Sequence, residues 1–167
     1  RHAVDELIGK LDDQKGVLLT SSYEFPGRYA RWSVGFTAPA VQISGTSLSF
    51  EISALNERGA VLTSMIKSKL LAEKKLFEVN EETFAREDGA ISFSGKVLPS
   101  ADYFPEEERS KQPSLFSLVR TINEIFASED AGQLGLYGAL GYDLTFQFEP
   151  IDLKKTRSTD QRDLLMY

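Results

Sequence analysis

The sequence contains no cysteine and a single histidine, His2. Without thiols the chain can form no disulfide, thiolate zinc site, iron–sulfur cluster or cysteine nucleophile. With one histidine it cannot assemble a histidine-based catalytic triad or a two-histidine metal site from its own residues. These absences remove several classes of catalytic and metal centre, and the lack of cysteine fits a reducing cytosol.

Positive charge and long apolar runs are also scarce. Lys and Arg number 19 against 25 Asp and Glu, which gives a formal net charge of −6. Because non-specific nucleic-acid binding and docking on anionic lipid both depend on Lys and Arg, this balance argues against either partner. No run approaches the ~18 apolar residues of a membrane span, and no signal peptide is recognisable. We therefore expect no nucleic-acid partner, no membrane partner and a cytoplasmic location.

What is present is a globular composition of 167 residues, 41% hydrophobic and 26% charged. A chain of this length can bury roughly 70% of its unfolded surface, so one domain with a sizeable core is expected. The turn signals favour hairpins over βαβ crossovers. This pattern predicts an α+β fold with antiparallel β-sheets packed as a sandwich or orthogonal pair and about three flanking helices.

The individual elements follow from apolar spacing and turn residues. Helices are predicted over 2–12, 65–75 and 115–126, the last capped by Ser114. A loop or short helix that carries the charged run Glu106–Glu108 is predicted between 98 and 113. Turns are predicted at 24–27 and 56–59. Strands are predicted over 17–23, 28–37, 41–44, 47–54, 60–63, 77–79, 91–97, 134–140 and the final apolar run 164–167.

The two ends of the chain are unusual. It begins Arg1-His2 without a methionine and ends on the apolar run 164–167 with no polar tail. Natural termini tend to fray in polar residues. We therefore interpret the chain as a fragment or an engineered domain.

Few residues indicate chemistry by themselves. Gly135, Gly138 and Gly141 recur every third residue, but a phosphate-binding loop needs a following helix and a lysine, so close sheet packing is the favoured interpretation. Asp143 could act as an acid, although a turn or cap carboxylate is commoner. Arg28 and Arg31 beside Trp32 could bind a small anion, although exposed arginines on a half-buried strand are commoner. Residue chemistry alone therefore shows no active site.

Four stretches carry a family resemblance. They are GVLLTSSYEFPGRYARW (16–32), ALNERGAVL (54–62), YGALGYDLTFQFEP (137–150) and DQRDL (160–164). In this order, over nearly the whole chain, they resemble the large component (component I) of anthranilate synthase, in particular the bacterial branch fused to its glutamine amidotransferase. Each stretch is moderately specific, and together they are specific.

The resemblance implies that residues 1–167 form a single N-terminal domain of regulatory and structural type. In the family, the C-terminal chorismate-binding catalytic domain follows. The intact enzyme is a lyase that converts chorismate and ammonia, drawn from glutamine, into anthranilate and pyruvate in tryptophan biosynthesis, with Mg2+ bound. The magnesium and chorismate ligands of the family lie beyond residue 167. The resemblance therefore implies no catalytic residue, metal site or cofactor within this chain, and an inactive isolated domain. The partners that it implies are the catalytic domain and a glutamine amidotransferase domain or subunit.

The same resemblance implies a tryptophan feedback site on the strand where the family carries Leu-Leu-Glu-Ser. The matching residues are Leu18-Leu19-Thr20-Ser21, so Thr20 replaces the glutamate. Leu19 can wall an apolar slot for the indole, and Ser21 can offer a hydroxyl. Because Thr20 has no charge, ammonium recognition loses an ionic partner, at about 1–3 kcal/mol if the contact was direct; Glu24 is a candidate substitute. The alternative is that residues 18–21 form an ordinary core strand.

Other functional interpretations remain open. The scaffold is shared with aminodeoxyisochorismate and aminodeoxychorismate synthases, so the same domain could belong to either. A free-standing amino-acid-binding or protein-interaction module is the alternative from a different class. A chorismate-binding domain encoded downstream would exclude the module.

Overall fold

The computed structural model describes residues 2–20, 33–149, 151–152, 154–158 and 160–167. Over these residues it combines α-helices, two short 3-10 helices and antiparallel sheets, which confirms the α+β prediction. In chain order the elements are α1 (His2–Leu11), β1 (Gly16–Leu19), β2 (Val34–Thr37), β3 (Val41–Thr46), β4 (Ser49–Ala54), α2 (Glu57–Ala72), β5 (Phe77–Val79), β6 (Phe84–Ala85), β7 (Ile91–Val97), η1 (Glu106–Lys111), α3 (Leu115–Phe126), β8 (Gly138–Leu140), η2 (Tyr142–Gln147) and β9 (Leu164–Met166).

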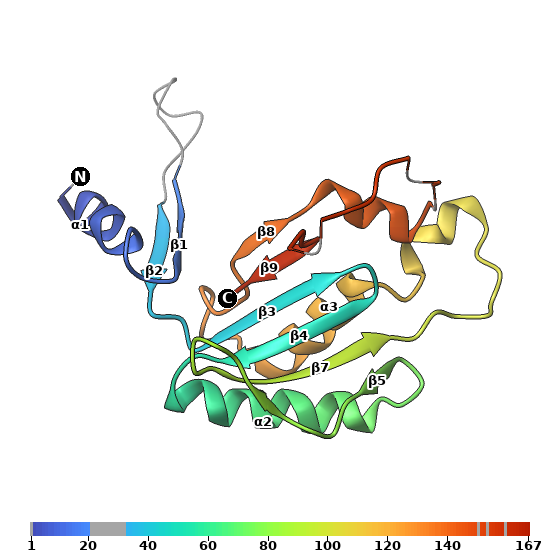
Figure 1. The fold of residues 1–167 in the computed structure, drawn as a ribbon, viewed down its shortest axis with the longest axis horizontal. Coiled ribbons are helices and arrows are strands. Elements are labelled where there is room, and N and C mark those ends of the chain that lie inside the picture. Colours follow the sequence, from blue (N-terminus) through green and yellow to red (C-terminus); the bar gives the residue numbers. More distant parts are fainter. Residues whose placement is uncertain (1, 21–32, 150, 153, 159) are drawn as a thin grey trace.

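The strands form two sheets of unequal size. A seven-stranded sheet has the order β5-β7-β4-β3-β9-β8, with β6 also paired to β7, and β1 and β2 form a separate two-stranded sheet. Figure 1 shows α1 beside this small sheet. Both lie at the end of the large sheet that is far from β5 in the view. The candidate tryptophan strand therefore belongs to a small N-terminal unit, made of α1, β1 and β2, and not to the large sheet.

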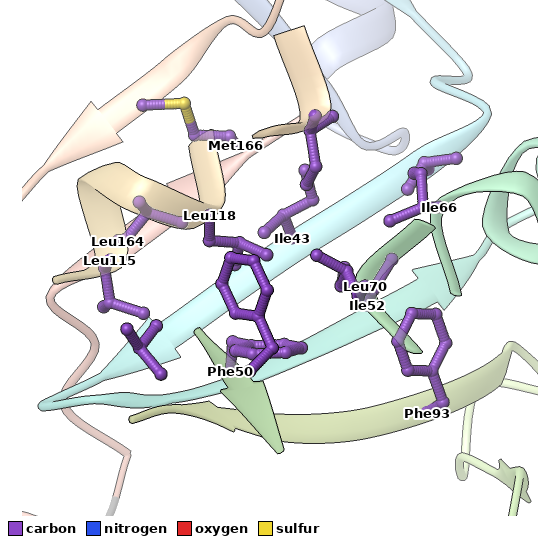
Figure 2. Packing of buried hydrophobic residues seen from close by; sticks show 14 of the residues in the cluster. Ile43, Phe50, Ile52, Ile66, Leu70, Phe93, Leu115, Leu118, Leu164 and Met166 are labelled. Atoms are coloured by element: carbon purple, nitrogen blue, oxygen red, sulfur yellow. The ribbon is translucent and has the colours of Figure 1, made fainter. Parts of the chain in front are cut away.

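The main core lies on one face of the large sheet. Ile43, Ile52 and Phe93 are directly opposite one another in the register of β3, β4 and β7, so their side chains share a face. Helices α2 and α3 pack on that face and complete the cluster shown in Figure 2. Two of the three predicted helices thus cover one face of the large sheet, whereas α1 packs on the small sheet. The fully buried large side chains of the cluster are Ile43, Ile52, Ile66, Leu70, Leu115, Leu118, Ile122, Leu164 and Val97.

Helix α2 begins earlier than predicted. The turn expected at 56–59 and the strand expected at 60–63 are both wrong, because Asn56 caps a helix whose first residue is Glu57. The Asn56 side chain accepts a hydrogen bond from the Gly59 backbone N at 3.0 Å. A Cβ on Gly59 would lie 1.9 Å from the Ala40 carbonyl oxygen, so this glycine allows the helix to approach β3 rather than making a turn.

Two strand predictions need smaller corrections. Ser47 and Leu48 are not strand residues, because Ser47 has φ of 54° and forms the tight turn between β3 and β4. Of the strand predicted over 134–140, only Gly138–Leu140 pairs with another strand. The other short predictions at 77–79 and 91–97 are confirmed in full.

The final strand lies inside the large sheet. β9 pairs with β3 on one side, through Ile43 opposite Met166, and with β8 on the other, through Leu140 opposite Leu164. Leu164 and Met166 are buried in the core cluster. The predicted strand at 164–167 is therefore confirmed over its first three residues, and it holds β8 in the sheet.

The predicted helix over 115–126 is also confirmed. α3 spans Leu115–Phe126 with Ser114 as its cap residue. The Ser114 backbone N donates a hydrogen bond to the Ser117 hydroxyl at 3.2 Å, which gives the helix a capping-box arrangement. The preceding charged run forms the exposed 3-10 helix η1, in agreement with the predicted loop or short helix.

Candidate functional site

The candidate tryptophan residues lie on and just after β1. This strand pairs with β2 in antiparallel register, with Leu18 opposite Gly35 and Leu19 opposite Val34. Thr20 follows the strand, and its hydroxyl lies 2.9 Å from the Ser33 hydroxyl. Ser21 and Glu24, together with Arg28, Arg31 and Trp32, lie outside the described residues.

The structure places Leu18 and Leu19 on opposite faces of the small sheet. A Cβ on Gly35, opposite Leu18, would lie 2.3 Å from Leu7 Cδ2 of α1 and 3.1 Å from Leu18 Cδ1. The Leu18 face is therefore the face against α1. Leu19 points the other way by strand alternation and is 48% exposed. An indole slot on this strand would thus be walled by Leu19, while Leu18 packs the helix.

Thr20 has a local partner. By alternation it shares the side of Leu18, and its hydroxyl oxygen and that of Ser33 form a hydrogen bond between two exposed residues. This bond closes the end of the β1–β2 pair beyond Leu19. An ammonium ligand would meet a hydroxyl here in place of a carboxylate, so Thr20 supplies a neutral acceptor.

An ion pair ties the start of β1 to the large sheet. Lys15 Nζ lies 2.8 Å from Asp88 Oδ2, and the Ala38 backbone N donates to the Lys15 carbonyl at 3.0 Å. The Phe36 ring of β2 meets the Tyr137 ring edge-on, with centroids 5.8 Å apart. These contacts hold the candidate strand beside the segment that leads into β8.

The glycine run has the structural role that its spacing predicted, at two of its three positions. A Cβ on Gly138 would lie 2.1 Å from the Leu165 carbonyl oxygen, and one on Gly141 would lie 3.2 Å from the Asp163 carbonyl oxygen. Gly135 has nothing within 4 Å of its Cβ position. Gly138 and Gly141 therefore allow the backbones of β8 and β9 to approach closely.

Asp143 belongs to a cluster that sequence reasoning missed. Its carboxylate accepts from Gln161 Nε2 at 3.0 Å and lies 3.3 Å from Arg157 Nη2. Arg157 also forms a two-point ion pair with Asp163, which is 2% exposed. The hydrogen bond to Asp163 is the main cause that raises the pKa of Arg157 above its ordinary value. A single guanidinium, that of Arg157, thus pairs with the two carboxylates of Asp143 and Asp163.

The same cluster also fixes the position of the β3–β4 turn. Asp163 Oδ2 accepts a hydrogen bond from the Ser47 backbone N at 2.7 Å, across 116 positions of the sequence. Asp163, ion-paired with Arg157, therefore joins the β3–β4 turn to the start of β9. Asp143 is a neighbour in this network, where it contacts the side chains of Gln161 and Arg157. No spacing rule in the sequence pointed to Arg157 or Asp163.

Among the residues that the structure describes, no group of three or more His, Asp or Glu side chains comes together as a metal site. None of the described helices is both long enough and apolar enough to span a membrane.

Together these features define an α+β domain with one large helix-backed antiparallel sheet and a small N-terminal unit attached at its side. Comparison with known proteins gives a relative for it. The chain is 46% identical, over all 167 residues, to an anthranilate synthase of Azospirillum brasilense, and it spans 22% of that protein's length. No protein-family model and no solved structure matches the chain. The resemblance found in the sequence is therefore confirmed: the chain is similar throughout to an N-terminal part of anthranilate synthase.

Proposed function

We propose that this chain is the N-terminal domain of an anthranilate synthase component I. The observation that carries the proposal is the 46% identity over the whole chain to an anthranilate synthase of which it spans 22%. The whole protein would convert chorismate and ammonia or glutamine to anthranilate and pyruvate in tryptophan biosynthesis. Its chorismate-binding domain, its Mg2+ ligands and its glutamine amidotransferase partner would lie outside these 167 residues.

The first role that we propose for the domain is to support the catalytic domain. The two helices that pack on the large sheet, α2 and α3, both lie on the Ile43–Ile52–Phe93 face. The opposite face carries a row formed by Ser44, Glu51 and Ser94, which are opposite one another in the register and half-buried. The row is small and polar apart from Glu51, which is ion-paired with Arg86, and a polar face of this kind suits packing against a second domain.

The second proposed role is a contribution to tryptophan feedback through Leu18, Leu19, Thr20, Ser21 and Glu24. What supports it is the exposed apolar side chain of Leu19 at the end of β1, where the Thr20 and Ser33 hydroxyls form a hydrogen bond on the opposite side of the small sheet. The Leu19 side chain offers an apolar surface for an indole ring. The missing family glutamate makes this the weaker of the two roles, because Thr20 offers no ionic partner to the ammonium.

The proposal is tested by measuring which products the extended protein and the isolated chain form from chorismate. The chain extended by its downstream reading frame should form anthranilate from chorismate, ammonia and Mg2+, detected by the fluorescence of the product. The 167-residue chain alone should form none. An aminodeoxychorismate or aminodeoxyisochorismate product from the extended protein would contradict the proposal in favour of the related synthases, and turnover by the isolated chain would contradict the division of roles.

The supporting role has its own test. Ser44→Arg places a long cation in the middle of the polar row and should lower the activity of the extended protein by about tenfold or more, because the second domain could not close on the sheet. Ser68→Arg, on the exposed side of α2, is the matched control and should leave the activity unchanged. Equal activity of the two variants would refute docking at this face.

A further inference from the structure

A pocket of about 400 Å3 lies where α2, α3, the end of β2 and the segment 133–137 meet. We call it the aromatic pocket, because four of its lining residues are Phe36, Phe126, Tyr137 and Tyr167. Aliphatic side chains, among them Leu62 and that of the buried Ile66, fill most of the remaining lining. It includes none of residues 18–20, so it is separate from the candidate tryptophan strand.

The aromatic wall of the pocket is held in place by its own contacts. The Phe36 and Tyr137 rings meet edge-on, with an interplanar angle of 74°. Tyr137 and Tyr167 exchange two backbone hydrogen bonds of 3.0 and 2.9 Å. The Tyr137 hydroxyl donates to the Gln133 carbonyl at 2.7 Å. Because that hydroxyl already has an acceptor, the wall offers ring surface, to which a flat aromatic ring can add an edge-on or offset contact.

The charge of the lining is of one sign. Among the described side chains that line the pocket, Arg58 is the charged one, and no Asp or Glu side chain lines it. Arg58, Asn123 and Gln133 are all exposed, so they lie toward the mouth of the pocket rather than at its floor. An arginine at the mouth of an apolar cavity matches a ligand with a buried ring and an anionic group near the surface, since its planar fork binds a carboxylate in two-point fashion.

We propose that the aromatic pocket binds a small aromatic carboxylate, with the ring inside and the carboxylate on the Arg58 guanidinium. The volume lies at the lower end of the roughly 300–1,000 Å3 range of small-molecule sites, which suits a ring of one or two cycles. A zwitterionic amino acid fits less well, because its ammonium would find no Asp or Glu side chain in the lining. The proposal does not depend on the role of the candidate tryptophan strand.

The test uses the 167-residue chain, with benzoate as the probe and benzyl alcohol as its neutral counterpart. Benzoate should bind with a stoichiometry of one in calorimetry and should shift the amide resonances of residues 134–137. Arg58→Gln should weaken benzoate binding by about tenfold, which corresponds to about 1.4 kcal/mol, and should leave benzyl alcohol binding unchanged. Arg120→Gln removes an exposed arginine of α3 that does not line the pocket, and it should change neither affinity.

A second pair of variants places a negative charge at the pocket and away from it. Leu134 is 60% exposed and lines the pocket, whereas Leu140 is 49% exposed and does not. Leu134→Asp should weaken benzoate binding several-fold through charge repulsion, and Leu140→Asp should not. The proposal is overturned if benzoate fails to bind, if Arg58→Gln and Arg120→Gln behave alike, or if the shifts at 134–137 follow protein concentration, since a second copy of the chain would then be the occupant.

Discussion

Lys15 and Asp88 form an ion pair, with Nζ and Oδ2 2.8 Å apart, that joins the start of β1 to the segment between β6 and β7. Arg86 Nε lies 3.6 Å from Asp88 and the same arginine pairs with Glu51 on β4. A row of alternating charges therefore leads from the candidate tryptophan strand to the polar face of the large sheet. Both Lys15 and Asp88 are about two-fifths exposed, so the pair guides the attachment of the small unit more than it stabilises the fold.

The attachment of the small unit should weaken in acid. The pKa of Asp88 lies below its ordinary value of 3.8, first because its carboxylate accepts a hydrogen bond from Lys15. A lowered folded-state pKa means that the stabilisation is complete above pH 3.8 and is lost as the pH falls through the lowered value. We expect the amide resonances of β1 to follow the titration of Asp88. Asp88→Asn should abolish that response, whereas Asp12→Asn, an exposed control, should keep it; a response unchanged in Asp88→Asn would contradict the coupling.

The buried carboxylate of Asp163 should be costly to remove. Asp163→Asn leaves Arg157 without its two-point partner and weakens the acceptor for the Ser47 backbone N. Removing one partner of a buried ion pair costs about 3 kcal/mol, and urea unfolding would measure the loss. Asp160→Asn changes an exposed carboxylate nearby and should cost less than about 0.5 kcal/mol. Equal midpoints for the two variants would show that the buried pair contributes little.

The packing of α1 on the small sheet should depend on Gly35. In Gly35→Ala the new methyl group would lie 2.3 Å from Leu7 Cδ2, so the helix must move or Leu7 must change rotamer, at about 1–3 kcal/mol. Gly9→Ala is the matched control within α1, because its Cβ position has nothing within 4 Å, and it should stabilise the helix by about 0.5–1 kcal/mol. Hydrogen exchange of the α1 and β2 amides would report both effects. Faster exchange in both variants would mean that the contact between residue 35 and Leu7 does not determine how α1 packs on the small sheet.

Restoring a carboxylate at position 20 should strengthen tryptophan binding. We expect the 167-residue chain to bind tryptophan weakly or not at all, and the extended protein to respond weakly, because Thr20 cannot pair with the ammonium. Thr20→Glu in the extended protein should tighten tryptophan binding by about tenfold, since a charge-assisted hydrogen bond replaces a neutral one. Ser68→Glu adds the same charge on α2 and should change nothing. Micromolar tryptophan binding by the isolated chain would contradict this view of the site.

Sequence patterns predicted most of the secondary structure, and the errors share a cause. The strand at 91–97 and the helix from Leu115 follow from periodicity and a capping serine, which are local signals. At 56–63 the residues Asn56 and Gly59 resemble a turn, yet Asn56 caps α2 and Gly59 is the helix residue that allows the close approach of Ala40. No local rule contains that approach, because it depends on where β3 packs. The short β8 likewise exists only where β9 supplies a partner.

For the candidate site, too, some features were determined by the sequence alone and others by the tertiary structure. Composition excluded thiol and histidine chemistry, and the motifs in the chain were enough to indicate the resemblance to anthranilate synthase and a strand that includes Leu18 and Leu19. Which face each leucine occupies depends on the packing of Leu7 against Gly35. The Arg157–Asp163 pair joins the β3–β4 turn to the last strand, and the aromatic pocket gathers side chains from segments far apart in the sequence. Such contacts are set by how helices and strands pack in three dimensions, because the distance between two residues along a chain does not specify the distance between them in space.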